Sequence, residues 1–133
     1  MDSKPISQGL KNIVEKMSDL IAEEKTERLR EDTGGWLYGG QTFMGLVKDL
    51  KTEMENQGFN IYSCAVRHFF KGANILDLPT KELLIIPING VATLSPGGQL
   101  IPDTYCSLKD QPTLSGNNID VIIVILEKGR AET

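Results

Sequence analysis

A glycine-bracketed aromatic segment, Gly34 to Gln41, carries the residues best suited to bind a ligand. Paired glycines let backbone amides approach a ligand closely, and the start of a following helix offers free N–H groups that favour an anion. Aromatic rings there can stack on a base, and arginine side chains can bind a phosphate. We therefore predict a site for a small anionic, nucleotide-like ligand, built from five side chains: Arg28, Arg30, Trp36, Tyr38 and Arg67.

The same segment has a plainer interpretation. It lacks the Gly-Lys-Ser/Thr ending of a Walker loop, and no strand is expected before it, as a dinucleotide fingerprint requires. Two glycine pairs are also typical of helix ends. On this alternative, residues 34–41 connect two helices, and Trp36 and Tyr38 fill the core or an interface. Arg67 lies among apolar residues, and it needs an acidic or phosphate partner only if it is buried.

Cys64 and His68 are the second candidate for chemistry, because a thiolate–imidazole pair is a nucleophile. On a helix, residues four apart are neighbours. On a strand they share a face but lie about 13 Å apart, which is too far for proton transfer. The aromatic and β-branched content of residues 59–70 favours a strand, although a helix also fits the pattern. We therefore expect a buried thiol and a partly exposed histidine.

Metal and cofactor chemistry is not indicated. One histidine and two cysteines 42 positions apart give no zinc-ligand spacing. The sequence contains no recognisable secretion signal, so we expect Cys64 and Cys106 to be free thiols. We predict no metal and no cofactor.

The overall charge excludes some partners. A net charge of −4 argues against binding to nucleic acid or to an anionic membrane surface. The longest apolar run is far shorter than a membrane span. With 40% hydrophobic and 24% charged residues, the 133-residue chain has the composition of a folded domain. We expect a cytoplasmic protein, or one of the host cytoplasm if the source is viral.

Two helices are predicted in the densely charged first part of the chain. Apolar residues at steps of three and four predict a helix that begins after Ser7 and extends toward Arg30, with a stop at Gly34-Gly35. A second helix fits Thr42 to Asn56, and Gly58 ends it.

Strands are predicted in the second part. The pattern indicates strands over 59–70, 81–89, 91–94, 99–109 and 119–127, an irregular segment over 75–79 and a loop over 111–118. The predicted fold class is α+β, with two N-terminal helices followed by a mainly antiparallel sheet of four or five strands. We expect a single domain over 1–133, with a helical part at 1–58 and a sheet part at 59–133.

Two apolar runs bear on association. Val121 to Leu126 reads VIIVIL, and residues 83–88 repeat the pattern. A strand with one face in water alternates apolar and polar residues, so these runs indicate strands covered on both faces. Two helices are too few to cover both faces of such a sheet, and we therefore predict a homo-oligomer.

These observations favour a non-enzymatic, homo-oligomeric binding protein whose ligand is a small anionic molecule or a protein partner. A structural, assembly or adaptor subunit, for example of a phage particle or a secretion apparatus, is the alternative; its charged first helix would be the docking element. A cysteine-dependent enzyme that uses Cys64 and His68, with Asp77 orienting the histidine, is a third hypothesis.

Overall fold

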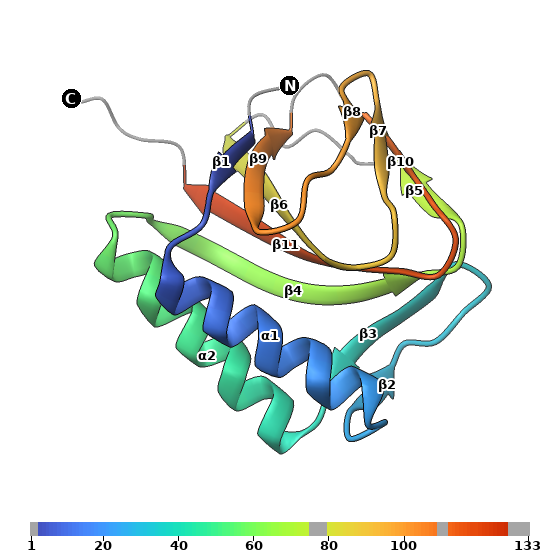
Figure 1. The fold of residues 1–133 in the computed structure, drawn as a ribbon, viewed down its shortest axis with the longest axis horizontal. Coiled ribbons are helices and arrows are strands. Elements are labelled where there is room, and N and C mark those ends of the chain that lie inside the picture. Colours follow the sequence, from blue (N-terminus) through green and yellow to red (C-terminus); the bar gives the residue numbers. More distant parts are fainter. Residues whose placement is uncertain (1–2, 75–79, 109–111, 128–133) are drawn as a thin grey trace.

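The computed structural model describes residues 3–74, 80–108 and 112–127, and these residues form three layers (Figure 1). Two helices lie side by side on one face of a seven-stranded sheet, and a four-stranded sheet covers part of the other face. The predicted irregular segment 75–79, which includes Asp77, lies outside the described residues.

The helix α1 (Gln8–Ala22) begins as predicted, because the Ser7 hydroxyl accepts a hydrogen bond from the backbone N–H of Leu10 at 3.2 Å. Its predicted extension toward Arg30 was wrong. The chain turns at Glu24, whose φ is 55°, and continues into the edge strand β2 (Glu27–Leu29). Few apolar residues follow Ile21, so a longer helix would have had no face to bury.

The helix α2 (Gln41–Asn56) runs antiparallel to α1 (Figure 1). It buries Phe43, Val47, Leu50 and Met54, which recur at helical spacing. The buried face of α1 consists of Leu10, Val14 and Met17. Both faces pack on the same side of the large sheet and form one hydrophobic core with it.

The large sheet has its strands in the order β1-β9-β6-β11-β4-β3-β2, and every pair is antiparallel. The three longest strands, β6, β11 and β4, lie together at its centre. The bounds are β1 (Ser3–Pro5), β3 (Gly35–Gly39), β4 (Ile61–Phe69), β6 (Lys81–Asn89), β9 (Thr104–Leu108) and β11 (Ile119–Glu127).

The small sheet is built from short strands in the order β5-β10-β7-β8. It lies on the side of the large sheet away from the helices and encloses a second core, which includes Leu94, Leu114, Ile85 and Val121. Its strands are β5 (Gly72–Asn74), β7 (Thr93–Ser95), β8 (Gly98–Gln99) and β10 (Thr113–Ser115).

The predicted fold class was wrong. The helices do not both precede the sheet, since β1, β2 and β3 come from the first 58 residues, and there are two sheets, of seven and four strands. The segment predicted as a loop at 34–41 contains β3, and the predicted loop at 111–118 contains β10. The stretch 99–109 is divided between β8 and β9. Glycines and short lengths made these strands look like turns.

The central strand β11 is covered on both faces by the chain itself. Val121 faces the small sheet and Ile122 faces the helices, and both side chains are fully buried. The chain itself therefore supplies the cover that the prediction of a homo-oligomer assigned to a second subunit. The apolar runs of the central strands therefore do not support self-association.

Candidate functional site

A buried aspartate, Asp120, is the centre of a polar cluster inside the core. Its Oδ1 accepts a hydrogen bond from the Tyr38 hydroxyl at 2.5 Å and lies 2.8 Å from Nδ1 of His68. Its Oδ2 accepts a hydrogen bond from Nδ2 of Asn89 at 3.1 Å. The Oδ1 of Asn89 accepts a further hydrogen bond from the Ser18 hydroxyl at 2.9 Å. One carboxylate therefore joins β3, β4, β6 and β11 and, through Asn89, the helix α1.

Strand register brings these residues together. Asp120 is directly opposite His68 on β4, and Trp36 on β3 is opposite the same histidine. A register shift between Asp120 and Val121 places Asn89 of β6 beside Asp120. Because side chains alternate along a strand, these residues share the face of the sheet that the helices cover.

Aromatic and polar side chains surround the His68 ring. Its ring stacks on that of Trp36, with centroids 4.1 Å apart and planes at 7°, and the Phe70 ring meets both edge-on. The Arg28 guanidinium carbon lies 3.9 Å from the Trp36 centroid. Arg28 comes from β2 and His68 from β4, on opposite sides of β3, so they cover the two faces of the indole. The Nε2 atom of His68 lies 3.2 Å from Oδ1 of Asn118.

The protonation of Tyr38 follows from this enclosure. Burial, together with its hydrogen bond to Asp120, raises the pKa of Tyr38 well above that of an ordinary tyrosine. The raised pKa adds stability that is fully present below pH ~10, where an unfolded tyrosine titrates, and that is lost as the pH rises further. Tyr38 thus remains a hydrogen-bond donor to Asp120 at neutral pH.

The cluster contains the groups of an acid–base site, but it is closed. The side chains of His68 and Asp120 are only 10% and 6% exposed, and the polar atoms of both are engaged with neighbours. A general base must reach the proton that it abstracts. We therefore assign the Asp120 network a structural role: it satisfies buried polar groups and locks the β2–β3 hairpin to the central strands.

The five residues predicted to bind a ligand do not form one open site. Arg28, Trp36 and Tyr38 lie together, but Trp36 and Tyr38 are buried and both faces of the Trp36 ring are covered. Arg30 is exposed just after β2, with φ at 53°. Arg67 is half-buried on the opposite face of β4, with its guanidinium carbon 5.4 Å from the Phe69 centroid. This arrangement matches the plainer interpretation of Trp36 and Tyr38 as core residues.

Sequence reasoning missed Asp120, Asn89 and Ser18 as members of this network. In the sequence, Asp120 lies only at the start of the predicted strand 119–127, where acids commonly make turns. An acid that directly precedes an unbroken apolar run is the one feature that could have indicated a buried carboxylate. Its partners lie 31, 52 and 82 positions away in the chain, so spacing alone could not identify them.

Cys64 lies on β4, as the strand interpretation of 59–70 required, four residues before His68 along the strand. Burial raises the pKa of the Cys64 thiol to about 12, which is the opposite of what an activated nucleophile needs. Burial also raises the pKa of Cys106. Both cysteines are free thiols, as expected.

Iodoacetamide labelling checks this assignment. Because the thiolate is the reacting form, we expect Cys64 in the native protein at pH 7.5 to react at least ~100-fold more slowly than in the urea-unfolded chain. The rate should rise only as the pH approaches 12. Fast labelling of native Cys64 at neutral pH would revive the cysteine-enzyme hypothesis.

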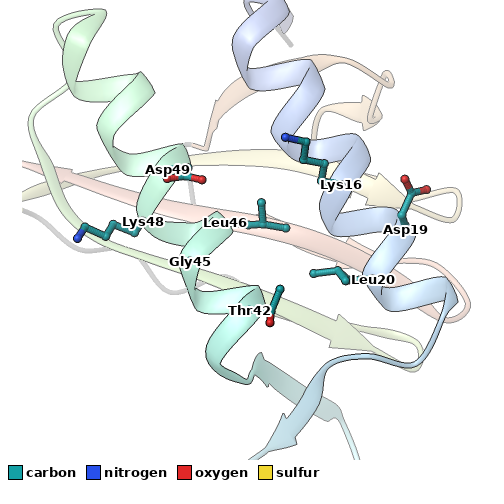
Figure 2. A pocket seen from close by; sticks show the side chains of 8 residues that line it. All are labelled: Lys16, Asp19, Leu20, Thr42, Gly45, Leu46, Lys48 and Asp49. Carbon is teal, nitrogen blue, oxygen red and sulfur yellow. The ribbon is translucent and has the colours of Figure 1, made fainter.

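An open groove between α1 and α2 is the second candidate site, and it has a volume of about 560 Å³. Figure 2 shows Leu20 and Leu46 pointing toward each other from the two helices, with Lys16 and Asp49 on opposite walls. The size falls in the range of ligand pockets. The residues that line it are Lys16, Asp19, Leu20, Thr42, Gly45, Leu46, Lys48 and Asp49.

Comparison with known proteins does not extend this description: no family model, curated protein or solved structure matches the chain. Within the described ranges, no three His, Cys, Asp or Glu side chains are placed to hold a metal ion. Neither α1 nor α2, the two helices of the described chain, has the length and apolar character needed to cross a bilayer.

Proposed function

We propose that this chain is a non-enzymatic binding protein and that the groove between α1 and α2 is its binding surface. The proposal depends on a difference in solvent access between the two candidate sites. The Asp120 network is closed, and its polar atoms bind one another. The groove is open to solvent and combines two leucines with charged side chains of both signs.

The groove suits a ligand with an apolar body and a polar edge. Leu20 and Leu46 are half-buried and pack against the core, so they offer an apolar floor that is already held in place. Lys16 and Asp49 lie on opposite walls of the groove beside these leucines (Figure 2) and can orient a polar or charged group of the ligand. Apolar surface supplies binding energy, and a few placed polar groups supply orientation.

Anilinonaphthalene sulfonate is a suitable probe, because it has an apolar aromatic body and one anionic group. We expect saturable binding to the native protein at low protein concentration, detected by fluorescence. Leu46→Glu and Lys16→Ala should each weaken this binding by about tenfold, or ~1.4 kcal/mol. The matched control is Leu29→Glu, at an exposed leucine of β2 outside the groove, which should leave binding unchanged.

The Lys16→Ala variant guards against a folding artefact, since Lys16 is exposed and its loss should not affect the core. Unchanged probe binding in both groove variants, with native circular dichroism, would refute the groove as the binding surface. A nucleotide panel followed by thermal shift tests the small anionic class separately, since a bound nucleotide would raise the melting temperature.

A further inference from the structure

Gly45, in the second turn of α2, is a residue that the fold itself does not explain. Its backbone is not in the left-handed region, and a Cβ built on it meets nothing within 4 Å. Glycine inside a helix is less favourable than alanine. The glycine of α1 is different, because a Cβ on Gly9 would lie 2.8 Å from the Glu53 carboxylate. Gly9 therefore lies where α1 contacts α2, whereas a side chain at Gly45 would meet no atom of the described chain within 4 Å.

A glycine on an outer helix face permits close approach of another backbone. Gly45 lines the groove, and the neighbouring Met44 is an exposed apolar side chain, 47% accessible to solvent. One part of the helix layer therefore contains the groove, Gly45, which has no side chain, and the exposed Met44. Another helix can therefore approach α2 closely at this place.

The charges of the groove favour one occupant. Its lining holds two lysines and two aspartates, so it carries no net charge that would select an acidic or a basic partner. Lys16 and Asp49 face the groove from opposite walls and form no ion pair in the part of the chain that is described. In a two-fold dimer every contact occurs twice, so Lys16 of one copy and Asp49 of the other can pair at two places.

The position of Gly45 fits the same symmetry. At a two-fold axis a residue meets its own copy, so two identical helices approach most closely where that residue is smallest. We propose that the occupant of the groove is a second copy of this chain, with the two α2 helices crossing at Gly45 and Lys16 of each copy facing Asp49 of the other. This inference rests on the proposed function of the groove as a binding surface.

Charge-reversal variants test the pairing. Lys16→Glu places two acids opposite each other in the homodimer, and Asp49→Lys places two lysines there, so each variant alone should be at least tenfold weaker in self-association than the parent chain. An equimolar mixture of the two variants should form a heterodimer, because every contact then joins opposite charges. Native mass spectrometry over a dilution series measures all of these species.

Gly45→Leu adds a steric test, since a leucine at the crossing point would hold the helices apart; the dimer should be lost while circular dichroism stays native. A dimer that all three variants leave intact overturns the inference. A strictly monomeric chain that still binds the anilinonaphthalene probe in the groove overturns the inference and leaves the proposed function standing. A monomer that does not bind the probe overturns both.

Discussion

Replacement of Asp120 by alanine is expected to lower the free energy of unfolding by about 3–5 kcal/mol, because it removes the acceptor that several buried groups share. Tyr38 and His68 would each lose a buried hydrogen-bond partner, and Asn89 would lose the acceptor for its amide. A domain of this size has a total stability of about 5–15 kcal/mol, so the loss is a large fraction of the whole.

Chemical denaturation and thermal melting measure this effect, and we expect the melting temperature to fall by about 10–20 °C. Asp120→Asn should cost less than Asp120→Ala, since the amide keeps the shape and one acceptor oxygen. Asp19→Ala, at an exposed site on α1, is the matched control and should stay within ~0.5 kcal/mol of the parent. If Asp120→Ala were as mild as Asp19→Ala, the network would not hold the sheet and hairpin together.

Two glycine-to-alanine substitutions are expected to change stability in opposite directions. Gly35 begins β3 with φ at +147°, and a Cβ there would lie 1.8 Å from the backbone carbonyl oxygen of His68. Strain and overpacking together should lower the stability of Gly35→Ala by about 3 kcal/mol or more. Gly45→Ala should instead raise the stability of the monomer by about 0.5–1 kcal/mol, because its helical backbone is unstrained and the space is open.

Urea unfolding of both variants, at a concentration where the chain is monomeric, measures the two changes. We expect the contrast because Gly35 keeps Trp36 beside His68, whereas the space around Gly45 is open. A large loss of stability in Gly45→Ala would mean that this glycine has a structural role in α2. In that case Gly45 would not mark a place left open for a second helix.

Strong local patterns predicted the central elements of the fold. The spans of β6 and β11 follow from long apolar runs, and α2 and the start of α1 follow from helical periodicity and the Ser7 cap. The short strands could not be predicted in this way. Glu27–Leu29 is charged and exposed, and it forms a strand only because β3 pairs with it. The small sheet likewise depends on pairings between distant segments.

In the candidate site too, residue types can be read from the sequence, but contacts between distant residues cannot. Residue type alone singles out Trp36 and Tyr38, but their role depends on which residues cover them. Strand order sets the partners of Tyr38 and Asp120. The prediction of an oligomer rested on cover for the sheet, which the small sheet provides. Gly45 and the groove are the features that favour association. They are recognised only in the structure, because the outer face of α2 is defined by which of its residues are buried.

Methyl NMR on protein labelled at leucine and methionine tests most directly whether the groove is the recognition surface. On dilution we expect the signals of Leu20, Leu46 and Met44 to shift, while those of the buried Met17 and Met54 stay fixed. Addition of the probe to the dilute protein should move the two leucine signals again. Groove methyls that respond to neither change, or shifts confined to Leu29 at the edge strand β2, would contradict the account.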